Sequence, residues 1–150
     1  MGVGKSTVGK ALASQLGVDF LDLDTMIGTA GPIFATEGEA GFRARERAAL
    51  VEVARTHEGV LALGGGTVVD PENVARLRTE GWTIVVLDAP LEVLTARVHA
   101  DAGTERPLAG RLAELVTARA GAYAAAGVRV DARGDIREVV NRLTSVLAQA

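Results

Sequence analysis

The sequence contains no cysteine among its 150 residues, and this absence excludes several classes of protein. Without cysteine there are no disulfide bonds and no thiolate metal sites. A chain that does without disulfides suits a reducing compartment, so we expect a cytoplasmic protein.

An excess of charge of one sign and long apolar runs are lacking too. The net charge of −3 gives no general attraction to nucleic acid or to an anionic membrane, so we expect neither as a partner. Lys5 and Lys10 interrupt the first residues, so no signal peptide is expected there. The apolar stretches are far shorter than the roughly 20 residues that cross a bilayer. A phosphate-binding site must therefore be a local feature.

The proportions of apolar residues, 48%, and of charged residues, 23%, are those of an ordinary globular domain. A domain of this length buries enough surface for a core. No repeat, low-complexity segment or linker interrupts it, so we expect residues 1–150 to form one domain. We expect that domain to be a monomer.

Helical and extended patterns alternate from one end of the chain to the other. Apolar spacing and end signals predict helices at residues 5–16, 39–57, 71–80, from 89–90 onward, 112–123 and 135–147. Extended segments are predicted at residues 19–23, 60–63, 83–87 and 128–130. The apolar run at 83–87 does not alternate, which suits a central strand covered on both faces. This order is typical of an α/β fold with a parallel sheet covered by helices.

The strongest chemical signal is the run Gly2-Val3-Gly4-Lys5-Ser6-Thr7, which opens the first predicted helix. Glycines let backbone N–H groups curl around phosphate oxygens, and the helix start adds a favourable dipole. Lys5 can reach the β- and γ-phosphates, and the Ser6 hydroxyl can ligate Mg²⁺. The first glycine of the G-x-x-x-x-G-K-[ST] pattern would precede Met1, and so would the apolar strand that feeds such a loop. The alternative is a glycine-rich tail before an ordinary helix.

A pair of carboxylates, Asp22 and Asp24, ends the first predicted strand. Their spacing of two puts both on one side of a strand, at the end where parallel sheets bind ligands. One can hold Mg²⁺ and the other can accept a hydrogen bond from a substrate hydroxyl. The alternative is a solvated acidic turn.

Three glycines and three arginines complete the set of chemical signals. Gly64, Gly65 and Gly66 follow a buried strand and would let a substrate approach the backbone, unless they form only a flexible turn. Phosphoryl transfer and carboxylate binding both need cations, and the candidates are Arg43, Arg106 and Arg119. Any single arginine could instead be a solvated surface residue.

Taken in order, these segments resemble the shikimate kinase family over nearly the whole chain. The matching segments are GVGKSTVGKALASQLG, FLDLD, FATEGEAGFRARE, LALGGG, RPL and RAGAY. The resemblance implies a P-loop fold related to the nucleoside monophosphate kinases, with three αβα layers. The family's parallel sheet has about five strands, and its first, central strand is missing from this sequence.

The resemblance also implies an activity and roles for residues. It implies transfer of the γ-phosphate of ATP, with Mg²⁺, to the 3-hydroxyl of shikimate. ATP would be held by residues 2–7 and by Arg106 from a lid around residues 100–112, and Mg²⁺ by Ser6 and Asp22. Shikimate would contact Asp24, Arg43, residues 64–66 and Arg119, and the catalytic residues would be Lys5, Asp24 and Arg106. Near Val130, where the family contacts adenine, the candidate is Arg133.

Two other functions stay open on the sequence alone. One is a related small-molecule kinase of the gluconate kinase type, although the paired aspartates and Arg43 favour shikimate. The other is a degraded, non-catalytic paralogue that binds nucleotide, which the missing loop glycine and the short lid segment favour.

Overall fold

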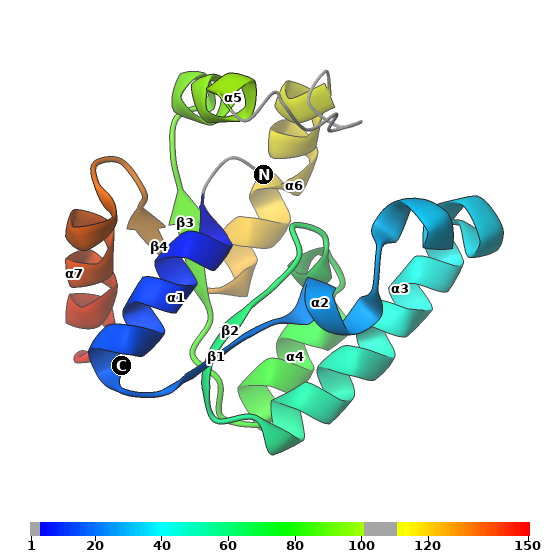
Figure 1. Cartoon of the computed structure of the whole chain (residues 1–150), viewed down its shortest axis with the longest axis horizontal. Coiled ribbons are helices and arrows are strands. Elements are labelled where there is room, and N and C mark those ends of the chain that lie inside the picture. Colours follow the sequence, from blue (N-terminus) through cyan, green and yellow to red (C-terminus); the bar gives the residue numbers. More distant parts are fainter. Residues whose placement is uncertain (1–3, 101–110) are drawn as a thin grey trace.

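The computed structural model describes residues 4–100 and 111–150 (Figure 1). Along the chain the elements are α1 (Lys5–Leu16), β1 (Asp19–Asp22), α2 (Leu23–Ile27), α3 (Ala30–Thr56), β2 (Gly59–Ala62), the 3₁₀ turn η1 (Thr67–Val69), α4 (Pro71–Thr79), β3 (Val85–Asp88), α5 (Leu91–Ala100), α6 (Leu112–Ala126), β4 (Val128–Asp131) and α7 (Ile136–Leu147). Helices and strands alternate, which confirms the predicted α/β class.

The strands pair in parallel, in two separate sheets. In the first, β1 pairs with β2, with Asp19 opposite Gly59 and Asp22 opposite Ala62. In the second, β3 pairs with β4, from Val85 opposite Val128 to Asp88 opposite Asp131. All four strands lie within one or two residues of their predicted positions.

Helices cover both faces of the strands (Figure 1). On one face, α1 and α7 pack against apolar side chains of three strands, including Val60 of β2 and Val85 of β3. On the other face, α3 and α4 pack against Leu61, and α4 and α6 against Val86. Neighbouring residues of β3 thus point to opposite apolar layers, which confirms that this strand is covered on both faces.

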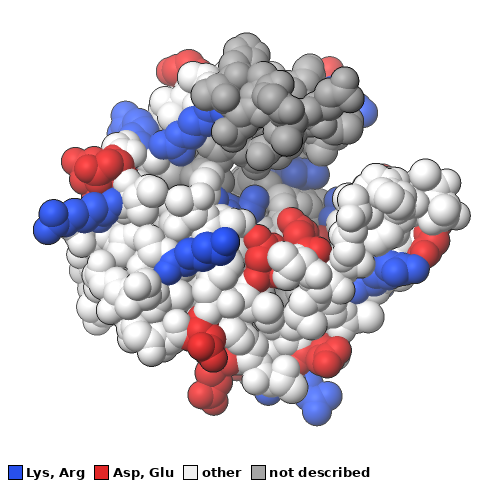
Figure 2. Space-filling model, viewed as in Figure 1, with Lys and Arg blue, Asp and Glu red and all other residues white. Residues whose placement is uncertain are grey.

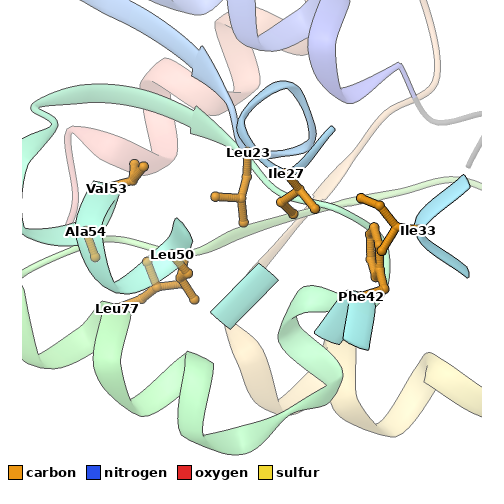
Figure 3. Packing of buried hydrophobic residues seen from close by; sticks show 8 residues of the cluster. All are labelled: Leu23, Ile27, Ile33, Phe42, Leu50, Val53, Ala54 and Leu77. Atoms are coloured by element: carbon orange, nitrogen blue, oxygen red, sulfur yellow. The ribbon is translucent and has the colours of Figure 1, made fainter. Parts of the chain in front are cut away.

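The largest apolar cluster lies under α2 and α3 (Figure 3). It comprises Leu23, Ile27, Ile33, Phe42, Leu50, Val53, Ala54 and Leu77. Three helices, α2, α3 and α4, contribute these residues, so the cluster fixes the short helix α2, which carries one of the predicted carboxylates, against α3.

Local end signals place several helices as the sequence predicts. Gly17 ends α1 with φ of 68°, a left-handed conformation that glycine adopts without strain. Asp70 accepts a hydrogen bond from the backbone of Glu72 and Pro71 starts α4. Asp135 and Glu138 form a reciprocal capping box at the start of α7.

The segment between β1 and β2 differs most from the prediction. The short helix α2 and the first part of α3, residues 30–37, were not predicted as helical. Gly38, with φ of 70° and ψ of −177°, breaks α3 into two parts, and only the second part was predicted. Both unpredicted pieces are too short to show an apolar period clearly.

Within the described ranges, no helix combines the length and the apolar character needed to cross a membrane.

The core analysis predicts that Leu50→Ala destabilises the fold strongly. Leu50 is 0% exposed at the centre of the cluster in Figure 3, so its truncation should cost about 2–5 kcal/mol of unfolding free energy. Leu91→Ala, at a side chain 39% exposed, is the matched control and should stay within about 0.5 kcal/mol. Urea denaturation followed by circular dichroism measures both. Equal midpoints for the two variants would contradict the assignment of this core.

Candidate active site

A cavity of about 980 Å³ lies at the carboxyl ends of the strands. Residues that follow β1, β2 and β4 line it, together with the first turn of α1 and parts of α3 and α6. Figure 2 shows this face of the molecule as hollowed, with acidic and basic side chains meeting in the hollow. Because parallel strands end at one edge, segments far apart in sequence share this cavity.

The start of α1 forms one wall of the cavity. Gly4 precedes the helix with φ of 80°, which an L side chain rarely adopts, and no side chain caps the helix start. The first-turn N–H groups of α1 therefore carry the positive end of the helix dipole at the cavity wall, where Lys5, Ser6 and Thr7 also lie. The predicted loop residues Gly2 and Val3 lie outside the described residues.

Asp22 joins this wall to the end of β1. Its Oδ2 accepts a hydrogen bond of 2.6 Å from the Ser6 hydroxyl, and its Oδ1 accepts one of 3.1 Å from the backbone N–H of Asp24. The second bond makes Asp22 the N-cap of α2. The Asp22 carboxylate is therefore fixed in place, and its Oδ2 lies beside the Ser6 hydroxyl.

Asp24 points into the same cavity from the first turn of α2. The Asp24 carboxyl is partly buried, and this desolvation is the main reason that its pKa lies above the ordinary value. The negative charge of Asp22 is the second cause. The Lys5 and Arg43 cations oppose the rise, and Glu46 adds to it. A carboxylate with a raised pKa accepts a proton more readily than one at its ordinary value, as a general base requires.

Arg43 is held by a buried carboxylate that the sequence did not reveal. Glu46 is 2% exposed and accepts hydrogen bonds of 2.9 Å from Arg43 Nη1 and from the Thr67 hydroxyl. Asn73 in turn donates from Nδ2 to the Thr67 carbonyl at 2.9 Å. Glu46 lies one helical turn after Arg43, so the pair could have been proposed from spacing, but its burial could not.

The glycines after β2 leave room for two guanidinium groups. A Cβ atom on Gly65 would lie 2.8 Å from Nη1 of Arg119, and one on Gly66 would lie 2.7 Å from Cζ of Arg43. The Gly65 carbonyl also accepts a hydrogen bond of 2.6 Å from the hydroxyl of Tyr123. Both arginines therefore reach the cavity across glycines, so two cations lie near one another at its wall.

Gly64 lets the backbone after β2 approach the carboxylate of Asp24 closely. A Cβ on Gly64 would lie 3.1 Å from Oδ1 of Asp24, closer than side chains normally pack. The glycine run thus allows contact with an aspartate as well as with the two arginines.

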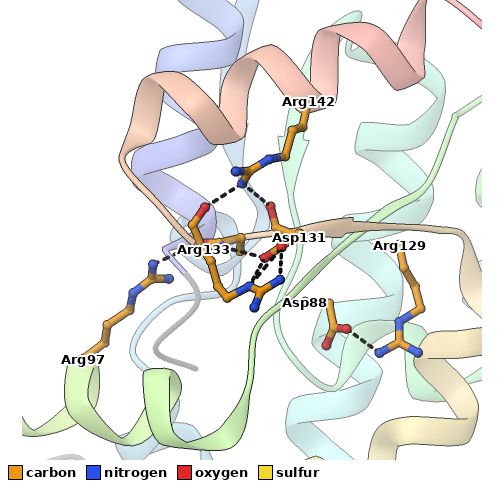
Figure 4. A network of polar contacts seen from close by, with 7 residues as sticks. Asp88, Arg97, Arg129, Asp131, Arg133 and Arg142 are labelled. Carbon is orange, nitrogen blue, oxygen red and sulfur yellow. Dashed lines mark hydrogen bonds and ion pairs between the residues drawn. The ribbon is translucent and has the colours of Figure 1, made fainter.

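A polar network holds the other end of the cavity, after β4 (Figure 4). Arg97 of α5 donates to the carbonyl of Ala132 at 2.9 Å, and both residues line the cavity. Arg133, the candidate named from the sequence, instead binds the Asp131 carboxylate through Nε and Nη2, at 2.6–3.0 Å. These bonds lower the pKa of Asp131 to about 2. The Arg133 guanidinium is therefore bound to Asp131, and the arginine that lines the cavity near β4 is Arg97.

The structure brings most of the predicted site residues together. The predicted residues that line the cavity are Gly4, Lys5, Ser6, Thr7, Asp22, Asp24, Arg43, Gly64, Gly65, Gly66 and Arg119. Arg106 and almost all of the predicted lid at 100–112 fall outside the described residues. Sequence reasoning missed the cavity roles of Glu46 and Arg97, since neither belongs to a recognisable motif.

Comparison with known proteins points to one family. A family model described as shikimate kinase matches residues 1–148. A shikimate kinase from Gloeobacter violaceus is 45% identical over 144 residues, covering 89% of this chain and 80% of that protein. The crystal structure of shikimate kinase from Bacteroides thetaiotaomicron superimposes with a TM-score of 0.86 at 35% identity, covering 99% of this chain and 94% of that one. Shikimate kinase from Acinetobacter baumannii, solved in complex with shikimate, gives a TM-score of 0.84 at 31% identity, covering 99% and 89%.

The raised pKa of Asp24 predicts that Asp24→Asn stabilises the folded protein at neutral pH. A pKa that is higher in the folded than in the unfolded state means that the ionised carboxylate disfavours folding. This penalty is absent below the ordinary value of 3.8 and reaches its full size once pH exceeds the raised pKa. Removing the charge should therefore raise the melting temperature at pH 7 to 8, by less at pH 5, and not at all near pH 3.8.

Melting curves of the wild type and of Asp24→Asn across this pH range measure the effect. Glu58→Gln, which neutralises an exposed carboxylate away from the cavity, is the control and should show no such trend. A variant that is less stable than the wild type at pH 7 would show that the attraction to Lys5 and Arg43 outweighs burial.

Proposed function

Because the chain belongs to the shikimate kinase family, we propose that it transfers the γ-phosphoryl group of ATP to the 3-hydroxyl group of shikimate, giving 3-phosphoshikimate and ADP. The observation that carries the proposal is a single cavity with a phosphate-type helix start at one wall and an aspartate with two arginines at another. The first wall suits an anionic phosphoryl donor such as ATP. The second suits a phosphoryl acceptor that carries both hydroxyl and carboxylate groups, as shikimate does.

ATP is assigned to the wall formed by the start of α1. The backbone around Gly4 and the helix dipole attract the phosphates, and the Lys5 ammonium neutralises charge on the β- and γ-phosphates. Gly2, Val3, Thr7 and Arg106 belong to the same proposed nucleotide site. Arg106 would act mainly on the charge that develops during transfer.

Mg²⁺ fits beside the phosphates, held by Ser6 and Asp22. The Ser6 hydroxyl oxygen and the Asp22 carboxylate oxygen are the kind of hard ligand that Mg²⁺ prefers. They lie 2.6 Å apart in a hydrogen bond, and both residues line the cavity. In the described part of the chain no three His, Cys, Asp or Glu side chains gather into a metal cage. Few protein ligands suit Mg²⁺, which keeps several waters and phosphate oxygens. When bound, the ion neutralises negative charge on the phosphate oxygens.

Asp24 is assigned as the group that receives the proton. As the 3-hydroxyl oxygen bonds to the γ-phosphorus, the bond from that phosphorus to the oxygen of ADP breaks, and the hydroxyl proton passes to the Asp24 carboxylate. The raised pKa of Asp24 supports this role, since a stronger base accepts a proton more readily. Asp22, bonded to Ser6 and capping α2, is placed for the metal instead.

The shikimate carboxylate is assigned to Arg43 and Arg119. Their guanidinium groups approach Gly66 and Gly65, so the carboxylate would bind over the glycine backbone, beside Gly64. Planar guanidinium groups bind carboxylates through two parallel hydrogen bonds, which favours this pairing over a point charge.

The proposal also covers the setting of the enzyme. We propose a cytoplasmic monomer whose ligands are the small molecules shikimate and ATP, without a nucleic-acid or membrane partner. The absence of cysteine and the modest net charge of −3 support this setting.

The assay of the activity uses the purified chain with ATP, Mg²⁺ and shikimate. ADP release should depend on shikimate, and mass spectrometry should find one phosphoryl group on the product. Lys5→Ala should lower turnover by about 10²-fold or more, because it removes a cation that stabilises the transferring charge. Circular dichroism should find its fold unchanged.

Three outcomes of this assay would contradict the proposal. Phosphorylation of gluconate in preference to shikimate would favour the related sugar-acid kinase. Binding of ADP without any turnover would favour a non-catalytic nucleotide-binding protein. Normal turnover by folded Lys5→Ala would remove this lysine from the mechanism.

The glycine wall predicts a specific defect in Gly66→Ala. Gly66 has φ of −98° and ψ of −8°, which alanine adopts freely, so the backbone should tolerate the change. Its new methyl group would displace the Arg43 guanidinium, so the KM for shikimate should rise by about tenfold or more, as expected for a lost charged hydrogen bond.

Gly121→Ala is the matched control, because a Cβ there meets nothing within 4 Å. Steady-state kinetics should find the KM for ATP changed by less than about twofold in both variants, well under the factor of ten that 1.4 kcal/mol represents. An unchanged KM for shikimate in Gly66→Ala would show that Arg43 does not bind the substrate.

A further inference from the structure

The three glycines after β2 differ in what holds their carbonyl groups. The carbonyls of Gly64 and Gly66 each accept a hydrogen bond from the backbone N–H three residues further along the chain, at 3.1 and 3.2 Å. These two bonds belong to local turns. The Gly65 carbonyl instead accepts a bond of 2.6 Å from the hydroxyl of Tyr123, which lies 58 residues away on α6. The middle carbonyl of the run is therefore held from outside the run.

Glycine on both sides makes the peptide between Gly65 and Gly66 easy to turn over. Such a turn changes ψ of Gly65 and φ of Gly66, and no Cβ atom resists it at either residue. Gly66 now has φ of −98° and ψ of −8°. A half-turn of the peptide would bring this φ into the positive range, which is also open to glycine. The backbone by itself thus has little preference between the two orientations.

The bond to Tyr123 decides which way this peptide faces. The Gly65 carbonyl points toward Tyr123, whose ring packs in the apolar layer with Val68 and Ala126. In a trans peptide the C=O and N–H groups point in opposite directions, so the Gly66 N–H points away from that layer. The described residues that line the active-site cavity include Gly65 and Gly66 but not Tyr123. No hydrogen bond between described residues uses the Gly66 N–H, so it is available on the cavity side.

The opposite orientation would be attractive to the two arginines of the cavity wall. Nη1 of Arg119 lies 2.8 Å from the position of a Cβ on Gly65, and Cζ of Arg43 lies 2.7 Å from the position of a Cβ on Gly66. A guanidinium group binds a carbonyl oxygen well. A Gly65 carbonyl turned toward the cavity would therefore be drawn to these cations and would repel a carboxylate that binds there. The hydroxyl of Tyr123 opposes that turn.

Helix α6 supplies both the cation and the group that holds the backbone beside it. Arg119 and Tyr123 lie four residues apart on α6 (Leu112–Ala126), so they share one face of the helix. Arg119 lines the cavity, while Tyr123 lies in the apolar layer beneath the glycine run. The hydroxyl is therefore carried on a packed ring and does not have to be ordered when a substrate binds.

We propose that Tyr123 is a positioning residue, whose hydroxyl holds the peptide between Gly65 and Gly66 with its carbonyl toward α6 and so presents the Gly66 N–H to the carboxylate of the acceptor substrate. Tyr123 itself does not touch the substrate. The identity of the ligand rests on the proposed function, whereas the orientation of the peptide does not.

The first test is the kinetics of Tyr123→Phe, which keeps the ring and removes the hydroxyl. The KM for shikimate should rise by about three- to tenfold, the range expected for one neutral hydrogen bond. The kcat and the KM for ATP should change by less than about twofold, because the carboxylate is remote from the transferred group and its contact is the same in the ground and transition states. Placing 4-aminophenylalanine at position 123 restores a donor at the same point of the ring, and it should return the KM for shikimate to the wild-type value.

Thr117→Val is the matched control on the same helix. The Thr117 hydroxyl is exposed, lies outside the cavity and donates to the Ala113 carbonyl of α6 at 3.0 Å. Its loss should leave both KM values unchanged. Circular dichroism should find both variants folded.

The second test observes the peptide directly, without substrate or turnover. In the protein labelled with nitrogen-15 glycine, the N–H signal of Gly66 is identified by its absence from the spectrum of Gly66→Ala. Tyr123→Phe should shift or broaden this signal, because the peptide then samples both orientations, and Thr117→Val should leave it unchanged.

The two tests separate this inference from the proposed function. A wild type that does not phosphorylate shikimate would contradict the proposed function, and the Gly66 signal would still decide whether Tyr123 holds the peptide. An unchanged Gly66 signal in folded Tyr123→Phe overturns the inference. So does an unchanged KM for shikimate in an active Tyr123→Phe, an equal rise in the KM for ATP, or a KM that 4-aminophenylalanine fails to restore.

Discussion

The carboxylate of Glu46, 2% exposed beneath the active-site cavity, sets a constraint on which much of the site depends. A charge at such a position is stable only with close partners, and removing one partner of a buried pair is strongly unfavourable. Arg43 and the Thr67 hydroxyl meet this need at 2.9 Å each. Thr67 begins η1 directly after the glycine run, so one carboxylate ties α3 to the segment that follows β2. With Arg43 fixed in this way, its guanidinium lies where a side chain on residue 66 would be, and glycine is required there.

The same arrangement gives the two aspartates different chemistry although they lie two residues apart. Asp22 is engaged by the Ser6 hydroxyl and by the start of α2, which suits it to a fixed role. Asp24 has less hydrogen bonding and lies near two other acids, so its pKa rises. Lys5 and Arg43 limit that rise and keep the group able to ionise. The different roles proposed for the two carboxylates thus follow from their different contacts.

Local signals made much of this molecule predictable from its sequence. Helix α1 ends at Gly17, α4 begins at Asp70-Pro71 and α7 begins at Asp135, and these signals act within one turn of the chain. Strands β2 and β3 are short, mostly apolar runs. Much of the cavity lining was predictable because its residues come in compact motifs, most of them at strand ends, where the parallel fold brings them together. Glu46 was missed because its burial depends on Thr67, 21 residues away. Arg97 was missed because its partner, the carbonyl of Ala132, lies 35 residues away, while Arg133 was the nearer choice in sequence.

The division of the sheet into two halves bears on how the site is held together. One half, β1 and β2, carries Asp22, Asp24 and the glycine run, and the other half, β3 and β4, leads to Ala132 at the far wall. No strand pairing links the halves among the described elements, so their relative position depends on helices that touch both. Helix α1 is such a link, since Val8 and Leu12 pack in one cluster with Val60 of β2 and with Val85 of β3. Helix α1 also begins at the wall proposed for the phosphates. The element proposed to position the phosphates is therefore also one that holds the two halves of the sheet together.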